Sequence, residues 1–332
     1  MQLPVPNAVR AMVEGDFTRL AERFSCTGFA VCRPGQGIIR ITTPQAPATR
    51  LRLLLSVGMH GDETAPIEML AQVLSDLATH PHELAVDLMV AVGNLDAIAQ
   101  GRRYVDADLN RLFRTDRGGL ASAAEAGRAN LLMRAAAEFF VERNGEKWHL
   151  DLHAAIRPSR YPAFAIVPDA VSDPSKCALI DWLGAAGIGA IVLNHKPAGT
   201  FSAYSVMQFG ATGCTVELGQ IGALGTNDLS LFAPMQKALE ALLRSGRTHA
   251  TTTAAPHVFN VAQEIVKRSD GFQMAFDSAT ENFTPLEPGA LIARDGDVVY
   301  RVGSETEYVV FPNPDVMVGQ RAGLTVMRVA YP

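Results

Sequence analysis

The chain has 332 residues, of which 48% are hydrophobic and 19% charged, and its net charge is −5. This composition is typical of a globular protein with a large buried core, built as one large and one small domain or as two medium domains. A mildly acidic chain lacks the clustered lysines and arginines of a general nucleic-acid-binding protein, so we expect no nucleic-acid partner.

The location of the protein is predicted from two absences in the sequence. No stretch approaches the roughly 20 apolar residues of a membrane span, and no long apolar run follows a basic start. We therefore expect a cytoplasmic protein without membrane association, and the sequence leaves a homo-oligomer open. No cysteine pair has CxxC spacing, so we expect reduced and mostly buried thiols at Cys26, Cys32, Cys177 and Cys214.

The first half of the chain alternates between strand and helix patterns. Residues 28–43 predict two short strands around a Pro-Gly turn. The apolar runs at 51–57 and 87–92 predict strands that are buried on both faces. Residues 66–78 predict a helix with a proline near its start, and the Ala-rich stretch 121–143 predicts a long helix.

The alternation continues to residue 243. Further strands are predicted at 148–153, 163–167, 190–194 and 214–219, and further helices at 175–186 and 228–243. Strands that alternate with helices favour a mostly parallel sheet covered on both sides, which is an α/β fold.

The pattern changes after a polar stretch at 244–256, which predicts a linker. Beyond it, helical periodicity is absent and short strand-like runs lie between Gly, Pro and Asp residues: 258–266, 272–276, 289–293, 297–302 and 307–312. The sequence thus predicts a catalytic domain at 1–250 and a small all-β domain at 256–332.

Chemically versatile side chains occur at the ends of the predicted strands. His60 and Glu63 directly follow the strand at 51–57, and His153 ends the strand at 148–153. Glu217 lies close to the end of a later strand. Loops at the carboxyl ends of strands form the ligand crevice of open α/β sheets, so these four side chains can converge.

The residue types fit a zinc hydrolase. Two imidazoles and one carboxylate leave zinc a fourth position for water, whose pKa falls toward ~7. Glu217 lies in an apolar strand, where burial would raise its pKa and suit it to act as a general base. The same donor set also accepts cobalt and manganese.

Each residue alone has an ordinary structural explanation. The HxxE spacing is common in surface loops, His153 could be a structural histidine, and Glu217 could be half of a buried ion pair. Their joint placement favours the metal site. Asp151 shares a strand face with His149 and His153. It is expected either to orient a metal-bound histidine or to pair with a cation, whereas His149 is expected to be structural.

Cationic side chains cluster near this predicted site. In the stretch 101–113, Arg103, Asn110 and Arg111 are candidates to bind a carboxylate or polarise a carbonyl, although a solvated loop has the same composition. Further cations follow later strands at Arg157, Arg160 and Lys196. So many cations in an acidic protein favour a small polyanionic substrate.

The motifs GMHGDETAP, DLNRLF, DLHAAIR and CTVELG together resemble those of the succinylglutamate desuccinylase/aspartoacylase family of the zinc carboxypeptidase superfamily. The resemblance covers nearly the whole chain, including residues 182–187, 197–205 and 307–324, but is less clear over the first 27 residues. It implies an α/β fold with a carboxypeptidase-like mixed sheet flanked by helices, followed by a small C-terminal all-β domain.

The resemblance also implies roles for individual residues. The implied ligands of one Zn²⁺ per subunit are His60, Glu63 and His153. Glu217 is the implied general base for the attack of zinc-bound water on an amide carbonyl. Arg103 would polarise the oxyanion, while Asn110 and Arg111 would bind a substrate carboxylate. We add Arg157 to the predicted substrate-binding residues.

The implied reaction is hydrolysis of N-succinyl-L-glutamate to succinate and L-glutamate, the last step of the arginine succinyltransferase pathway. The three carboxylates of this substrate suit an arginine-rich pocket. One alternative is an aspartoacylase-like deacylase of another N-acyl amino acid. A second, a non-catalytic binding protein, would be expected to lack a metal ligand or the base, but all four residues are present.

Overall fold

The computed structural model describes residues 6–45, 47, 49–141, 145–196, 199–248, 255–277 and 279–330. Its α-helices are α1 (Asn7–Glu14), α2 (Thr18–Ser25), α3 (Thr64–Leu77), α4 (Leu95–Gln100), α5 (Ala126–Val141), α6 (Asp173–Ala185), α7 (Phe201–Phe209) and α8 (Ala233–Ser245). Its first strands are β1 (Ala30–Gly35), β2 (Ile38–Thr42), β3 (Arg52–Val57), β4 (Asp87–Val92), β5 (Lys147–Ala155), β6 (Ala163–Pro168), β7 (Ala190–Asn194) and β8 (Thr212–Gln220). The later strands are β9 (His257–Val266), β10 (Gln273–Met274), β11 (Thr284–Leu286), β12 (Leu291–Asp295), β13 (Val298–Arg301), β14 (Glu307–Val310) and β15 (Arg321–Val329).

One long sheet organises the molecule, with the strand order β1-β2-β4-β3-β5-β8-β6-β7-β9-β15-β14-β11. The neighbours β4, β3, β5 and β8 run parallel, whereas β6 runs antiparallel to β8. The mixed α/β sheet flanked by helices is therefore confirmed, and every strand predicted before residue 220 is present.

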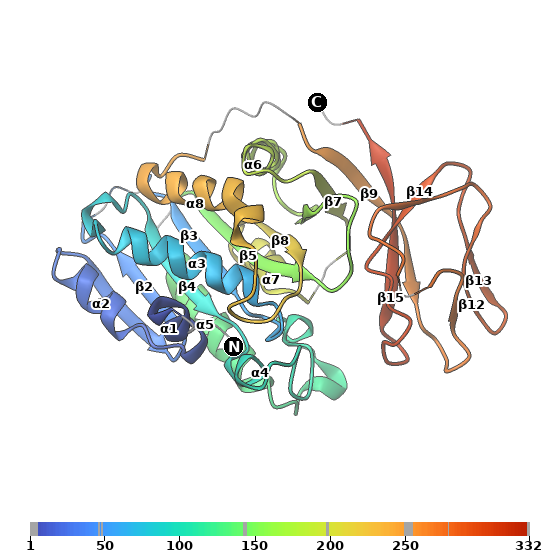
Figure 1. Ribbon diagram of the computed structural model, residues 1–332, viewed down its shortest axis with the longest axis horizontal. Helices are drawn as coiled ribbons and strands as arrows, with labels where there is room; N and C mark the ends of the chain where they lie inside the picture. The colour runs from blue at the N-terminus through green and yellow to red at the C-terminus, as the bar shows by residue number, and fades with distance from the viewer. Residues whose placement is uncertain are drawn as a thin grey trace.

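Alternating side chains of the buried strands fill two separate cores. In β3, Leu53, Leu55 and Val57 pack on the side of α1, α3, α6 and α8. Leu54 points to the other side, where it joins side chains of α5 and α7. Figure 1 shows α3 and α8 lying together over one face of the sheet. A strand with helices on both faces is mostly apolar, which explains the nearly continuous apolar runs.

Some elements differ from those predicted. The long helix begins at Ala126 rather than at residue 121, because residues 118–120 form a separate 3₁₀ turn. The short helices α1, α2, α4 and α7 and the strands β11 and β15 were not predicted. In α7 most of the first six side chains are buried, so its sequence lacks the polar face that gives a recognisable helical period.

The C-terminal region is all-β within the described residues and continues the main sheet (Figure 1). Strand β9 pairs in parallel with β7, and β15 runs antiparallel to β9 along most of its length. The predicted linker lies partly outside the described residues, which omit 249–254, and α8 extends into its beginning as far as Ser245. The division into domains at residues 250 and 256 stays a prediction.

The exposure of the cysteines and the apolarity of the helices bear on two predictions from the sequence. Cys26, Cys32 and Cys177 are exposed and Cys214 is buried, so the prediction of mostly buried cysteines is wrong. Within the part of the chain that the structure describes, none of the helices has both the length and the apolarity of a membrane span.

Candidate functional site

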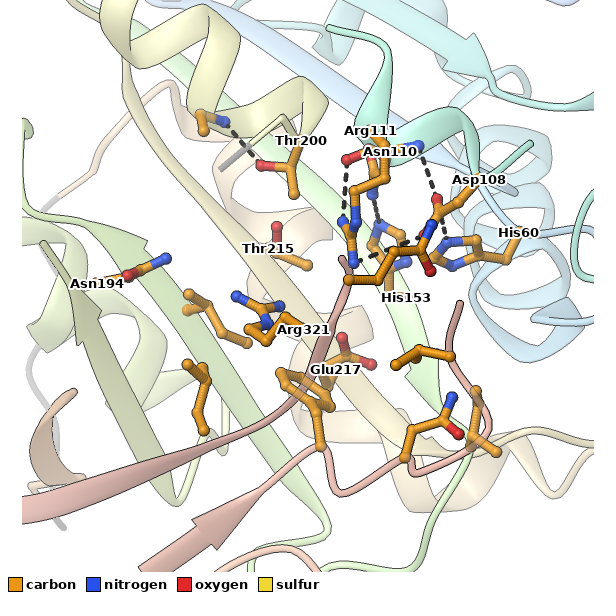
Figure 2. Close-up of a pocket in the computed structure, with 18 of the residues that line it drawn as sticks. His60, Asp108, Asn110, Arg111, His153, Asn194, Thr200, Thr215, Glu217 and Arg321 are labelled. Atoms are coloured by element: carbon orange, nitrogen blue, oxygen red, sulfur yellow. Dashed lines mark hydrogen bonds and ion pairs between the residues drawn. The ribbon is translucent and has the colours of Figure 1, made fainter. Parts of the chain in front are cut away.

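A cavity of about 700 Å³ lies over the carboxyl halves of β5 and β8. Loops of the α/β region and residues 311–324 of the C-terminal region both contribute to its wall. Figure 2 shows how its labelled side chains converge. The cavity brings together the predicted metal ligands, the predicted base and the predicted substrate-binding residues: His60, Glu63, Arg103, Asn110, Arg111, His153, Arg157 and Glu217.

The loop after β3 depends on two glycines. Gly58 has a φ of +65°, a left-handed conformation that glycine adopts readily. At Gly61, a Cβ atom would lie 2.2 Å from the backbone carbon of Ala97, so no larger residue fits. The Gly61 N–H donates to the Arg103 carbonyl over 3.1 Å. These constraints fix the loop that carries His60 against the loop that carries Arg103.

The register of the sheet places Glu217 beside His153. These two residues are direct partners in the parallel pair β5–β8, and Val57 at the end of β3 is the partner of Leu152. His153 and Glu217 therefore lie within their strands, a few residues before the strand ends, rather than at the ends. Their side chains still share one face, because adjacent strands of a pleated sheet keep their side chains in step.

His60, Glu63 and His153 form a compact and buried group of donor atoms. The Nδ1 atoms of His60 and His153 each lie 2.7 Å from one carboxylate oxygen of Glu63. One ligand atom from each of the three residues falls within 4.8 Å of the others. Two imidazole nitrogens and one carboxylate are a common ligand set for a divalent metal ion.

The outer nitrogens of both histidines also favour metal binding. His60 Nε2 lies 3.0 Å from an Asp108 oxygen, and His153 Nε2 lies 3.0 Å from an Asp151 oxygen. With a proton on each Nε2 directed at these carboxylates, each neutral imidazole would turn its Nδ1 lone pair toward Glu63. Lone pairs that face one another at this distance require protons or a cation between them.

The electrostatics of His153 support the same conclusion. Burial alone would lower the pKa of His153, but the carboxylates of Asp151 and Glu63 outweigh it and hold this pKa well above its ordinary value. The donor group therefore attracts positive charge. A divalent metal ion would satisfy its donor atoms better than their contacts with one another do.

Behind the donor group, Asp151 connects to a buried chain of hydrogen bonds. Ser56 donates to Asp151 over 2.6 Å and lies 2.8 Å from His149, whose other nitrogen lies 2.8 Å from Ser205. Burial lowers the pKa of His149 to about 4, so this ring is neutral. Asp151 therefore contacts His153, as expected if it orients that histidine. His149 occupies a structural position.

Glu217 faces the cavity (Figure 2). Its side chain is buried, yet none of the described residues forms a hydrogen bond or ion pair with its carboxylate. Burial raises the pKa of Glu217 to about 7. The alternative of a buried ion pair therefore does not occur within the described chain, and the carboxylate is free to exchange a proton near neutral pH.

Asn110 contacts both the donor group and α7. Its Oδ1 accepts the Phe201 N–H over 3.1 Å, and its Nδ2 lies 3.2 Å from His153 Nε2. The same nitrogen lies 3.0 Å from Asp151, so Asn110 and Asp151 both contact the outer nitrogen of His153. Asn110 also lines the cavity beside the donor group.

The predicted cations differ in their surroundings. Arg103 donates to Glu63 over 2.8 Å, and Arg111 lies 3.7 Å from an Asp108 oxygen. Arg157 lines the cavity. Lys196 also lines it and forms a 2.9 Å ion pair with Glu264. Arg160 is exposed and does not contribute to the wall, so this part of the predicted cationic cluster is wrong.

Asp108 and Arg321 also line the cavity but were not predicted as site residues. Asp108 lies two residues before Asn110, inside a stretch that already carried predicted site residues. Arg321 begins β15, and its only sequence signal was its place in the stretch 307–324 that supports the family resemblance.

Glu125 anchors the loop that carries these side chains. Its buried carboxylate accepts backbone N–H groups from Val105, Asp106 and Ala107 at 2.7, 3.1 and 3.0 Å, and an amide N–H from Asn94 at 3.2 Å. Burial opposes its ionisation, but these hydrogen bonds outweigh burial and lower its pKa. No sequence pattern indicates this role, because the carboxylate meets the loop only in the folded chain.

Replacing Glu125 with glutamine should destabilise the protein. An amide –NH₂ would then face N–H donors that now bind a carboxylate, and hydrogen bonds to a charged group contribute about 1.5–3 kcal/mol. We expect Glu125→Gln to lower the free energy of unfolding by about 2 kcal/mol in urea titrations. Glu138→Gln is the control, because that side chain is 60% exposed in its contact with Arg40. Equal stability of the two variants would contradict the anchoring role.

Two family models match the chain. The succinylglutamate desuccinylase/aspartoacylase catalytic domain matches residues 49–243. The AstE/AspA barrel-sandwich hybrid domain matches residues 254–329. The two matches together cover most of the sheet and all the residues of the donor group.

Individual relatives match over nearly the same length. The succinylglutamate desuccinylase of Burkholderia pseudomallei (strain 1710b) is 43% identical over 297 residues, which are 89% of this chain and 84% of that protein. The structure of succinylglutamate desuccinylase from Vibrio parahaemolyticus has a TM-score of 0.82 at 28% identity and covers 94% of this chain and 95% of its own. The enzyme from Vibrio cholerae has a TM-score of 0.80 at 31% identity, with 92% of each chain covered. The chain therefore belongs to the succinylglutamate desuccinylase/aspartoacylase family.

Proposed function

We propose that the protein is a zinc-dependent amide hydrolase that converts N-succinyl-L-glutamate and water to succinate and L-glutamate. This would be the last step of the arginine succinyltransferase pathway. The observation that carries the proposal is the buried donor group of His60, Glu63 and His153 with the unpaired carboxylate of Glu217 beside it. The desuccinylases that match most of the chain at up to 43% identity support the choice of substrate.

His60, Glu63 and His153 would hold the zinc ion through the Nδ1 atoms and the carboxylate that already face one another. When bound, zinc supplies Lewis acidity and a water acidic enough to react at neutral pH. The carboxylates of Asp108 and Asp151 keep both imidazoles in the tautomer that leaves Nδ1 free.

Glu217 would act as the general base. Its carboxylate is not engaged by any described residue, so it can take a proton from the attacking water and pass that proton to the leaving amide nitrogen. Its position beside His153 in the sheet register keeps it next to the donor group. A raised pKa brings its proton affinity close to that of the groups with which it must exchange.

The cations around the donor group would orient the substrate and stabilise charge. Arg103 lies next to Glu63, where it can stabilise the negative charge that develops on the carbonyl oxygen. Asn110 and Arg111, which both line the cavity, would bind one substrate carboxylate through the amide and the guanidinium. Arg157 would attract carboxylates at the cavity wall.

A panel of N-acyl amino acids tests the proposed substrate. We expect the zinc-loaded protein to hydrolyse N-succinyl-L-glutamate with a kcat/KM at least about 100-fold above that for N-acetyl-L-aspartate, because a cation left unpaired in the cavity is costly. The measurement is release of the free amino group, with zinc content determined on the same sample. Faster turnover of N-acetyl-L-aspartate would instead identify an aspartoacylase-like deacylase.

A further inference from the structure

Arg321 is a cation in the cavity wall that no anion among the described residues neutralises. It begins β15, is partly buried and lines the cavity. None of the described residues forms a hydrogen bond or ion pair with its side chain. Two acids that influence it have other partners, since Glu264 pairs with Lys196 at 2.9 Å and Asp108 pairs with His60 at 3.0 Å.

The surroundings of Arg321 make its charge costly. Burial, together with the nearby positive charge of Arg111, lowers the pKa of Arg321 to about 10. The guanidinium is still charged at neutral pH, so the folded protein keeps an unpaired cation in a place where water is scarce. An arrangement of this kind gains stability when an anion arrives, because the cost of removing the cation from water has already been incurred.

Hydrogen-bond donors surround the same part of the cavity. Figure 2 shows Arg321 extending toward Thr215, with Asn194 and Thr200 on the far side from His60. Thr200 caps α7, and the first residues of that helix line the cavity, so the positive end of the helix dipole faces inward. In Figure 2 Arg111 lies nearer to His153, and its charge is close enough to act on Arg321. The cavity therefore has a second guanidinium group, besides that of Arg111, that can face a carboxylate.

We propose that Arg321 binds a second carboxylate of the substrate, distinct from the one at Asn110 and Arg111. This inference rests on the proposed function and extends it, because it assigns a specificity-determining residue to the C-terminal region. A guanidinium matches a carboxylate in bidentate geometry, and Thr215 and the start of α7 complete the subsite. Substrates with one carboxylate would leave Arg321 unpaired and would be selected against.

Three truncated substrates identify the carboxylate that Arg321 binds. N-butyryl-L-glutamate lacks the acyl carboxylate, N-succinyl-L-norvaline lacks the side-chain carboxylate, and N-succinyl-4-aminobutyrate lacks the α-carboxylate. We expect Arg321→Met to lower kcat/KM for N-succinyl-L-glutamate on the order of 10- to 100-fold, as for loss of a charged hydrogen bond. For the truncated substrate that lacks the partner carboxylate, the variant should match the wild type within about 3-fold, because no bond to Arg321 remains to be lost.

Two controls separate recognition from folding. Arg294→Met, at an exposed position on β12, should leave all four rates unchanged. Arg321→Lys keeps the positive charge but not the planar guanidinium that binds a carboxylate through two N–H groups. It should therefore recover part of the lost kcat/KM. An equal loss of rate on all four substrates, or no loss on N-succinyl-L-glutamate, would overturn the inference.

A binding experiment keeps this test separate from that of the proposed function. Calorimetry with succinate and with L-glutamate, the two products, should show one of them binding the zinc-loaded wild type on the order of 10- to 100-fold more tightly than Arg321→Met. This result would support the subsite even if N-succinyl-L-glutamate were not hydrolysed. Equal affinities in the two proteins, or no binding of either product to the wild type, would contradict it.

Discussion

Replacing Glu217 with glutamine should lower kcat by on the order of 10²-fold or more while the metal content stays that of the wild type. The amide keeps the size of the side chain but cannot accept the proton of the attacking water. The metal should remain, because Glu217 is not one of the residues whose donor atoms face one another in the buried group. Steady-state kinetics and elemental analysis of the same sample measure both quantities.

The pH profile provides a second readout for the same variant. In the wild type, kcat/KM should fall as pH drops through the pKa of Glu217, because the base must be ionised. Burial raises that pKa to about 7, and a bound cation would lower it, so the acidic limb should lie at or below about pH 7. Glu217→Gln should lose this limb, whereas Glu138→Gln at an exposed position should keep it. Near-wild-type activity of Glu217→Gln would show that the base lies elsewhere.

The stability of Glu217→Gln should change in the opposite direction to its activity. A carboxyl group whose pKa is higher in the folded than in the unfolded protein stabilises the fold at low pH. For Glu217 this contribution is lost as pH rises from its ordinary value of 4.5 through about 7. In metal-depleted protein at pH 8, the variant should therefore have a higher melting temperature than the wild type. A purely structural role for Glu217 would give a lower one.

His153→Ala should abolish metal binding and reduce activity to background. The substitution removes one of the donors, and the remaining pair of His60 and Glu63 cannot complete a three-ligand site. The expected result is less than about 0.1 zinc per chain after dialysis. Replacing a residue that only contacts a ligand lowers metal affinity about 10- to 100-fold, and removing a ligand itself should lower the affinity far more. Inductively coupled plasma mass spectrometry measures this content.

The control for this experiment is His80→Ala, because His80 is exposed and lies outside the cavity. That variant should retain one zinc ion and full activity. If His153→Ala also retained stoichiometric zinc, the metal would be bound by other residues. The alternative that His153 is a structural histidine would then be the better explanation.

Much of the fold follows from local sequence patterns. Buried strands such as β3 and β4 are continuous apolar runs because helices cover both their faces, and this signal needs no knowledge of their neighbours. Helix α7 and strand β15 lack such a signal. The side chains of α7 are buried around most of the helix, and β15 gains its partner β9 only through a pairing distant in sequence.

The site was predictable where its residues follow strands and was missed where contacts are long-range. The metal-ligand candidates and Glu217 lie near strand ends, which a parallel sheet brings to one side. Glu125 directly precedes α5 and holds a loop of the cavity, and Arg321 lines the cavity from the C-terminal region. No local sequence pattern indicates a role for either residue. The pairing of His153 with Glu217 across β5 and β8 also required the register, which a single sequence does not contain.

Titration of metal-depleted protein with zinc, with succinate release from N-succinyl-L-glutamate measured at each step, tests the central claim most directly. The proposed site predicts an inactive apoprotein whose activity rises linearly and levels off at one zinc ion per chain. Activity that is independent of zinc, or zinc binding without any succinate release, would contradict it.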